Sequence, residues 1–318
     1  MIELTLGHSP DPDDAFMWWP IAPVPGSGLS PSIDTGGFRF TPLAMDISEL
    51  NGRAAAQGDL DITAISMFAL AQVADRYMLT HCGASMGMGY GPKLLARGAG
   101  PARRADLPRT GPLGIDWLRP GMKVAIPGER TTAYLVLRLM LGERARGIEF
   151  VPMPFDRIIP ALLRSDVDAG LVIHEAQVTY QDSGLELIAD LGAWWTETTN
   201  LPLPLGANAI RRDLDERFGK GTLTRLCGVL EASIRHALEH RERGLDYAMR
   251  FAGDTPRMLA DRFISLYVND LTLDMGVVGV SAVRELLGRA MGAGLGSGGD
   301  AVDVVGPAGV LERRGACG

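Results

Sequence analysis

Polar residues that could perform acid/base chemistry or bind a small acid follow four short apolar segments of the chain. They are His8 with the run Ser9 to Asp14, Ser66, Thr131 with Thr132, and His174 with Glu175. His174 directly follows the apolar run Ala169 to Ile173, which predicts a buried strand that ends at an imidazole. Imidazole titrates near neutral pH, so His174 is a candidate general base. A histidine satisfied by a backbone carbonyl is an equally good interpretation of this position alone.

Hydroxyl side chains at two of these places could bind a carboxylate. Thr131 and Thr132 open an amphipathic segment, and the unpaired N–H groups in the first turn of a helix attract anions. A threonine at that place can equally cap the helix. Ser66 ends the segment Leu60 to Ser66 at a strand-to-helix turn, and it has the same two interpretations.

The run from Ser9 to Asp14 favours helix capping over catalysis. Asp11 precedes Pro12, which suits an N-cap followed by proline at the first helical position. A metal site built on the three aspartates lacks a supporting motif, so no metal is predicted. His236 and His240 lie four residues apart without an HExxH pattern, and we interpret them as a solvated helix face.

The sequence predicts no organic cofactor. No strand-like segment is followed by a Gly-rich dinucleotide fingerprint or a phosphate-binding P-loop. Cys82, Cys227 and Cys317 are odd in number and widely spaced, giving neither a disulfide framework nor a zinc pattern. A reducing cytoplasm fits these cysteines best.

The elements that must position these residues alternate along the first two thirds of the chain. Apolar runs and amphipathic segments predict βαβ units with a largely parallel sheet, whose carboxyl ends would bring the polar clusters to one edge. The predicted strands are 2–7, 38–42, 60–65, 78–84, 122–127, 148–152, 168–173 and 204–210, and the predicted helices are 13–19, 46–57, 67–76, 131–142 and 156–164. From 211 to 290 the periodicity is helical almost throughout. Segments 20–37 and 98–121 are interpreted as surface insertions, and 292–318 as a flexible tail.

The length, composition and charge of the chain limit the class of protein to which it can belong. The chain has 318 residues, 46% of them hydrophobic, which predicts about two globular domains. Its net charge of −7 argues against nucleic acid as a partner. The N-terminus lacks a basic start followed by an apolar segment, and no apolar run reaches the roughly 18 residues of a membrane span. We therefore expect a cytoplasmic protein that does not contact a membrane.

Five blocks of sequence, taken in order, resemble the 1,4-dihydroxy-6-naphthoate synthases of the futalosine route to menaquinone. They are Gly7-His-Ser-Pro-Asp-Pro-Asp-Asp-Ala-Phe16, His81-Cys-Gly-Ala-Ser-Met-Gly87, Lys123-Val-Ala-Ile-Pro-Gly128 with Thr131-Thr-Ala-Tyr-Leu135, Val167-Asp-Ala-Gly-Leu-Val-Ile-His-Glu175 and Leu201-Pro-Leu-Pro-Leu-Gly206. The resemblance runs from residue 1 to about 213, whereas the helical third matches only in general character. Ala176 departs from the pattern, because a glycine more often follows the His-Glu pair.

The resemblance implies an α/β fold of the type 2 periplasmic binding protein class, with two lobes, a cleft between them and a helical C-terminal segment. One lobe would comprise 1–93 and 207–318, and the other 94–206, with hinge crossings near 91–96 and 204–208. His174 and the two threonines would then face Ser66 and the Ser9 to Asp14 turn across the cleft. Lobe closure would assemble the site and exclude water.

The resemblance also implies a lyase that needs no cofactor. It would convert cyclic dehypoxanthine futalosine, an aromatic carboxylate with a sugar-derived ring, into 1,4-dihydroxy-6-naphthoate and dihydroxyacetone. His174 would be the general base. The residues that match the family's substrate-binding stretches are Ala64, Ile65, Ser66, Thr131 and Thr132, and Ser9 and Asp11 of the facing turn are added as substrate-binding candidates. The partner is thus a small-molecule substrate, and the oligomeric state stays open, with a homodimer as one option.

Two other functions fit the same fold. Chorismate dehydratase of the same pathway would act on a different acid, and the Ser9 to Asp14 block with His174-Glu175 favours the naphthoate synthase over it. A solute-binding protein of a transporter would share the two lobes. We expect such a protein to carry a secretion signal or a lipid-attachment cysteine near its start, and we find neither.

Overall fold

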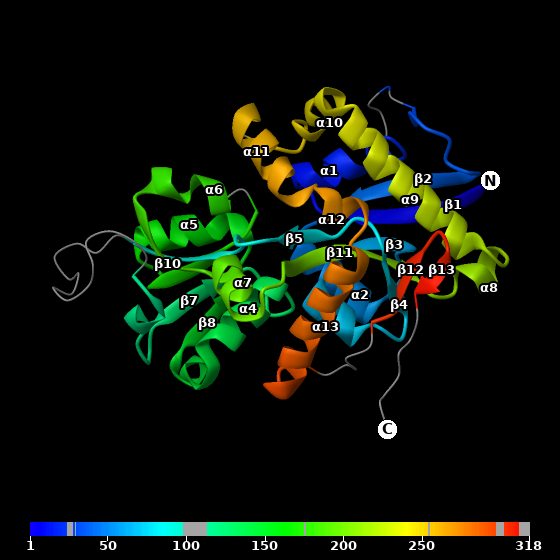
Figure 1. Ribbon diagram of the computed structural model, residues 1–318. Helices are drawn as coiled ribbons and strands as arrows, with labels where there is room; N and C mark the ends of the chain where they lie inside the picture. The colour runs from blue at the N-terminus through cyan, green and yellow to red at the C-terminus, as the bar shows by residue number, and fades with distance from the viewer. Residues whose placement is uncertain are drawn as a thin grey trace. The chain divides into compact units, whose positions relative to one another are not determined.

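The computed structural model of the chain forms two compact units (Figure 1). It describes residues 1–23, 28, 30–97, 113–174, 176–253, 255–296 and 302–311. Unit 1 comprises Met1–Met86 and Pro204–Gly318, and unit 2 comprises Gly87–Leu203. The chain therefore passes twice from one unit to the other. No helix among the described residues is long and apolar enough to cross a bilayer.

Unit 1 is built on a mixed sheet with the strand order β13-β12-β4-β11-β3-β1-β2, and β5 pairs with β11 off this path. Its strands are β1 (Ile2–His8), β2 (Phe38–Ala44), β3 (Ile62–Ser66), β4 (Tyr77–Thr80), β5 (Ser85–Gly87), β11 (Leu203–Arg211), β12 (Val304–Gly306) and β13 (Gly309–Leu311). Strands β2, β1 and β3 are mutually parallel, whereas β11 runs antiparallel to both β3 and β4. The prediction of a largely parallel sheet is therefore wrong for this returning strand.

The helices of unit 1 pack their apolar faces on this sheet and on one another. They are α1 (Pro12–Trp18), α2 (Ile47–Ala56), α3 (Met67–Gln72), α8 (Leu214–Phe218), α9 (Thr222–Glu239), α10 (Arg241–Ala248), α11 (Arg257–Tyr267), α12 (Asp270–Leu273) and α13 (Gly276–Gly292). In α9, Leu226, Leu230 and Ile234 recur every four residues and are fully buried. They join the core that contains Trp18 of α1, which lies beside α9, α10 and α11 (Figure 1). The predicted helical character of 211–290 is confirmed.

Unit 2 has a five-stranded sheet in the order β10-β6-β9-β7-β8. Its elements are β6 (Lys93–Arg97), 3₁₀ turn η1 (Ile115–Trp117), β7 (Lys123–Ile126), α4 (Thr132–Leu141), η2 (Gly142–Gly147), β8 (Glu149–Pro152), α5 (Phe155–Arg164), β9 (Ala169–Val172), α6 (Ala176–Thr179), η3 (Tyr180–Ser183), β10 (Leu185–Asp190) and α7 (Leu191–Thr199). Strands β8, β7 and β9 are mutually parallel, whereas β6 pairs antiparallel with both of its neighbours, β9 and β10. The sheet is again mixed.

Two predicted irregular segments are partly ordered. The expected tail 292–318 contains the β12–β13 hairpin, because Val304 and Val305 are buried and β12 adds to β4 as a parallel strand. Arg212 Nη1 also lies 2.7 Å from Asp303 Oδ2 at the start of that hairpin. In the expected insertion 98–121, residues 98–112 lie outside the described residues, as do 24–27 and 29 of the insertion 20–37.

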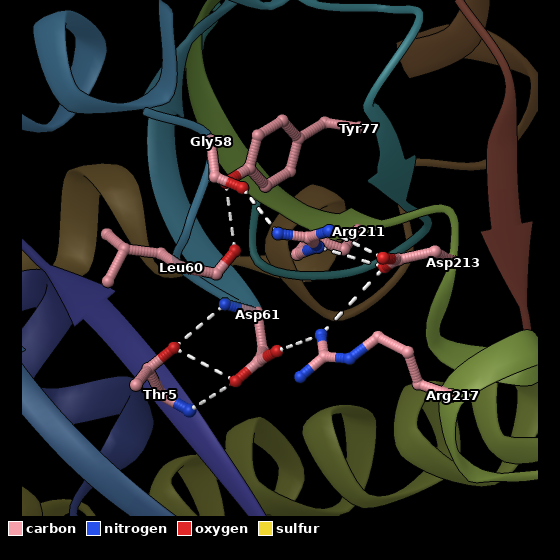
Figure 2. Close-up of polar contacts among 8 residues, drawn as sticks. All are labelled: Thr5, Gly58, Leu60, Asp61, Tyr77, Arg211, Asp213 and Arg217. Carbon is pink, nitrogen blue, oxygen red and sulfur yellow. Dashed lines mark hydrogen bonds and ion pairs between the residues drawn. The ribbon is translucent and has the colours of Figure 1, made fainter. Parts of the chain in front are cut away.

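A buried carboxylate holds β3 in register with β1 (Figure 2). Asp61, 5% exposed, immediately precedes β3, and its Oδ2 accepts hydrogen bonds from Thr5 N and Thr5 Oγ1 of β1. Thr5 Oγ1 in turn accepts from Asp61 N at 2.8 Å. Arg217 Nη1 donates to Asp61 Oδ1 at 2.6 Å, and Asp213 holds the adjacent Arg211. Both carboxylate oxygens of the buried Asp61 therefore accept hydrogen bonds.

We expect Asp61→Asn to lower the free energy of unfolding by about 2 kcal/mol, because the amide cannot accept all three hydrogen bonds and leaves Arg217 without its buried partner. Urea unfolding followed by circular dichroism measures the change. Glu3→Gln, which removes the exposed ion pair with Arg39, is the control and should have almost no effect. Equal stabilities of Asp61→Asn and the parent would contradict a structural role for this network.

Candidate functional site

The predicted site residues fall in two groups, one in each unit. In unit 1 the group lies where β1 and β3 end. These strands are parallel neighbours, with Leu6 opposite Ile62, so His8 at the end of β1 and Ser66 at the end of β3 come to the same sheet edge. Gly206 of β11 pairs with Ser66 and completes this edge.

Ser66 is fixed by a buried asparagine that the sequence analysis did not single out. Asn51 of α2 is 0% exposed, and its Oδ1 accepts from Ser66 N at 2.9 Å. Its Nδ2 donates to Ser66 Oγ, also at 2.9 Å. Ser66 occupies the N-cap position of α3, yet its hydroxyl makes no capping hydrogen bond. The capping interpretation is therefore wrong for Ser66. A polar residue between Leu50 and Ala54 on the buried face of α2 was the available signal.

The turn that follows β1 is closed by hydrogen bonds within itself. Ser9 Oγ donates to Asp11 Oδ2 at 2.6 Å, and Ser9 N donates to Asp14 Oδ2 at 2.7 Å. Asp11 stands at the N-cap of α1 before Pro12, as predicted, but its side chain makes no capping hydrogen bond. His8 Nδ1 lies 2.7 Å from Ser9 O, which fixes the ring beside the turn.

Burial raises the pKa of Asp14, and the neighbouring His8 opposes this effect. The folded protein therefore binds the Asp14 proton more tightly than the unfolded chain does. Such a group contributes most to stability at low pH, and the contribution is lost as the pH rises above the ordinary value of 3.8.

We expect Asp14→Asn to gain stability relative to the parent as the pH is raised from about 3.5 to 7, because an amide still accepts from Ser9 N without placing a charge in the core. Urea unfolding at four pH values measures the difference. The matched control is Asp75→Asn, which makes the same change at a side chain that is 76% exposed and therefore buries no charge. A flat difference for Asp14→Asn would contradict the effect of burial.

Ala64 and Ile65 lie within β3 and are buried at 5% and 0% exposure. Ala64 packs in a small apolar cluster with Leu50 and Leu60. Both residues pair with β11, where Asn208 is opposite Ala64 and Ala207 is opposite Ile65. Both residues are thus buried and lie within two positions of Ser66 along β3.

In unit 2 the second group lies where β7 and β9 end. Val124 pairs with Ala169 in parallel register, so the turn after β7 and the residues after β9 reach the same edge of the sheet. The turn after β7 leads to Thr131 and Thr132, and β9 leads to His174. The sequence prediction that these residues share a sheet edge is confirmed within this unit.

Thr131 caps α4. Its Oγ1 accepts from Tyr134 N at 3.3 Å and donates to Gly128 O at 2.7 Å. The capping interpretation is therefore correct for Thr131, whose hydroxyl hydrogen is already committed. Thr132 is the first residue of the helix and is 2% exposed.

His174 is half-buried and has an unusual backbone conformation. Its φ of 56° places it in the left-handed region, which a residue other than glycine rarely occupies. Phe155, the first residue of α5, packs edge-on against the imidazole with ring centroids 4.5 Å apart. His174 O accepts from Gln177 N at 3.1 Å, and Glu175 lies outside the described residues. The imidazole therefore packs against the start of α5.

The other candidate residues, two histidines and two cysteines, have packing interactions. The rings of His236 and His240 stack 4.0 Å apart, and His236 also lies against Trp19. The interpretation as a solvated face is therefore wrong for His236, which packs on the core of unit 1. Cys82 and Cys227 are buried, and burial raises the pKa of Cys227 to about 12. Within the described ranges, no three potential ligands gather as a metal site would require.

Comparisons with known proteins place the chain among enzymes of one pathway. A family model described as menaquinone biosynthesis matches residues 4–291. The 1,4-dihydroxy-6-naphthoate synthase of Streptomyces coelicolor is 40% identical over 296 residues, which cover 92% of this chain and 94% of that protein. The enzyme of the same name from Thermus thermophilus is 38% identical over 295 residues, covering 93% and 96% respectively.

Solved structures agree with the fold described above. A crystal structure of an Archaeoglobus fulgidus protein is 37% identical, has a TM-score of 0.77 and matches 92% of this chain and 98% of that one. A Candida albicans protein described as having the generic periplasmic binding protein fold is 9% identical, with a TM-score of 0.64 and coverages of 94% and 92%. The fold is therefore of the periplasmic binding protein class. Given the family model and the two named enzymes, the chain belongs to the menaquinone biosynthesis family and is an enzyme.

Proposed function

We propose that the chain is a carbon–carbon lyase that converts cyclic dehypoxanthine futalosine into 1,4-dihydroxy-6-naphthoate and dihydroxyacetone. The observation that carries this proposal is the similarity, over nearly the whole chain, to two enzymes named for that product. The arrangement around His174 supports it, because a half-buried imidazole that packs against Phe155 lies just after the carboxyl end of β9.

In the proposed mechanism His174 removes a proton from the substrate as general base. The electron pair released by that step drives a retro-aldol-like cleavage, in which the bond between the naphthoate precursor and the sugar-derived carbons breaks. Loss of dihydroxyacetone leaves a ring system that aromatises, and aromatisation pulls the reaction forward. A positioned base contributes about 10²–10⁴-fold, so binding and orientation must supply the remainder of the acceleration.

We assign substrate binding to the predicted residues of both groups. Thr132 is the first residue of α4, and the dipole of a helix favours an anion such as a carboxylate near its N-terminus. Ser66 and its neighbours Ala64 and Ile65 supply the edge of β3. The side chains of Ser9 and Asp11 are hydrogen-bonded to each other. We therefore assign these two residues contacts with the substrate through backbone atoms or through acceptor atoms.

We expect His174→Asn to lower kcat at least 100-fold, because asparagine tolerates the left-handed backbone of this position but cannot accept the proton. Turnover of cyclic dehypoxanthine futalosine is measured by mass detection of the naphthoate. The control is His240→Asn, which changes an exposed histidine of unit 1 and should leave the rate unaltered. Similar rates for His174→Asn and the parent would remove His174 from this role.

We expect Thr132→Val to raise KM about 10-fold with little change in kcat or stability, because valine has nearly the same shape and lacks the hydroxyl. The paired variant Thr131→Ala should instead lower the free energy of unfolding by about 1 kcal/mol, since it removes the N-cap of α4. Steady-state kinetics and urea unfolding of both variants test this division. An unchanged KM for Thr132→Val would count against an anion site at this helix.

Incubation of the parent with chorismate separates this proposal from the alternative dehydratase. Dehydration of chorismate with no turnover of cyclic dehypoxanthine futalosine would assign the chain to the other reaction. Binding of either acid without turnover would favour a binding protein.

A further inference from the structure

Lys93 is a charged residue of unit 2 that has no part in the mechanism described above. It is the first residue of β6, which runs antiparallel to β9. Lys93 pairs with Val172, the last residue of β9, and His174 follows two residues later. Because antiparallel strands run in opposite directions, the start of β6 lies at the sheet edge where β9 ends. Lys93 therefore shares this edge with the proposed general base.

Lys93 and His174 also belong to the same face of the sheet. Directly opposed residues of neighbouring strands have their side chains on one face, so Lys93 is on the face of Val172. Val172 belongs to the core cluster that contains Ile158 of α5. The His174 ring packs against Phe155, the first residue of the same helix. Both Lys93 and the imidazole are thus on the side of the sheet that α5 covers.

The ammonium group of Lys93 is held by Asp190, the residue opposite it at the end of β10. Lys93 Nζ donates to Asp190 Oδ2. The other carboxylate oxygen, Oδ1, accepts from the backbone N–H groups of Gly192 and Ala193 at the start of α7. Asp190 is therefore shared between the ammonium group and the positive end of a helix dipole. The backbone of α7 fixes the carboxylate, and the carboxylate holds the ammonium group.

Asp190 uses only part of the hydrogen-bonding capacity of Lys93. An ammonium group has three hydrogens, and among the described residues Asp190 is the only one to which Lys93 Nζ donates. The side chains of Lys93 and Asp190 are 15% and 18% exposed, so the pair is partly accessible at this edge. Lys93 can therefore give a further hydrogen to a substrate oxygen while it keeps its carboxylate partner.

We propose that Lys93 is a catalytic residue that stabilises the negative charge formed on the sugar-derived fragment when the carbon–carbon bond breaks. The inference rests on the proposed function, which supplies the substrate. His174 takes the proton of a hydroxyl group on the naphthoate side of that bond, and the hydroxyl oxygen becomes a carbonyl oxygen. The electron pair of the broken bond passes to the three-carbon fragment as an enediolate, whose oxygen accepts from Lys93 Nζ. Return of the proton from His174 to the carbon of this fragment gives dihydroxyacetone, and the naphthoate side tautomerises to its aromatic form.

The order of the strands agrees with these roles. Strand β9 lies between β6 and β7, so Lys93 and Thr132 reach the edge on opposite sides of the strand that leads to His174. The proposed anion site at Thr132 is then on one side of the base and the ammonium group on the other. A substrate with its carboxylate toward α4 would have its sugar-derived carbons toward Lys93.

Lys93→Met tests the inference, because methionine resembles the apolar stem of lysine and lacks the charge. We expect kcat to fall about 100-fold with less than about a 3-fold change in KM, as for an interaction made only in the transition state. Lys93→Arg keeps a cation and should lose less than about 10-fold in kcat. The matched control is Lys123→Met, which removes an exposed ion pair with Glu149 at the start of β7, on the opposite edge of this sheet. Both kinetic constants of this control should equal those of the parent.

Binding of the product separates catalysis from a structural role. The product 1,4-dihydroxy-6-naphthoate lacks the sugar-derived carbons, so a fluorescence titration should give the same affinity for Lys93→Met and the parent. A loss of affinity and of urea stability in parallel with kcat would overturn the inference, because it would make Lys93 a structural residue. An unchanged kcat overturns it as well, and so does a raised KM with unchanged kcat.

A second variant covers the case in which Lys93→Met does not fold. Lys93→Gln, whose amide can still donate to Asp190, is then assayed with the same expectation for kcat and KM. Failure of the proposed function is recognised separately, because the parent itself would then not turn over cyclic dehypoxanthine futalosine. Turnover by the parent with an unchanged kcat in the variant would remove Lys93 from its role and leave the proposed function intact.

Discussion

The register between β1 and β3 is the constraint on which the site in unit 1 depends. Successive side chains of a strand point to opposite faces, so a slip of one residue would turn Ser66 away from Asn51. Asp61 prevents that slip by binding both the backbone and the side chain of Thr5. It immediately precedes β3, whereas Ser66 ends the strand. A clamp at one end of the strand therefore determines what its other end presents.

Unit 2 has a similar interaction, in which an aspartate before one strand is hydrogen-bonded to the parallel neighbouring strand. Asp168 immediately precedes β9, and its Oδ2 accepts from Lys123 N at the start of the parallel strand β7 at 2.7 Å. Asp168 N donates back to Lys123 O at 2.9 Å. His174 follows this strand as Ser66 ends β3. In both units an aspartate just before a buried strand thus aligns it with a parallel neighbour and sets the place of the polar residue at its end.

Much of this arrangement was predictable because it follows from local pattern. The parallel strands, the helices after them and the edge positions of Ser66 and His174 are properties of short segments. Strand β6 overlaps the segment expected to form a hinge crossing, and β10 is not among the predicted strands. The two strands pair antiparallel with each other, and β6 also pairs antiparallel with β9, so they do not follow the strand-helix-strand pattern of parallel βαβ units. The roles of Thr131 and Ser66 could not be separated either. Asn51 lies 15 residues from Ser66, and only the folded chain brings their side chains together.

The chemical capacity of a hydroxyl therefore depends on its partner more than on its position. Thr131 and Ser66 both begin helices, but Thr131 gives its hydrogen to Gly128 O while Ser66 receives one from Asn51. Burial makes the distinction consequential, because a donor without an acceptor in a low-dielectric site is costly until a ligand supplies the acceptor. Ser66 is 4% exposed, and its hydroxyl accepts from Asn51 without capping α3, so the hydrogen of this buried group is committed to neither of these partners.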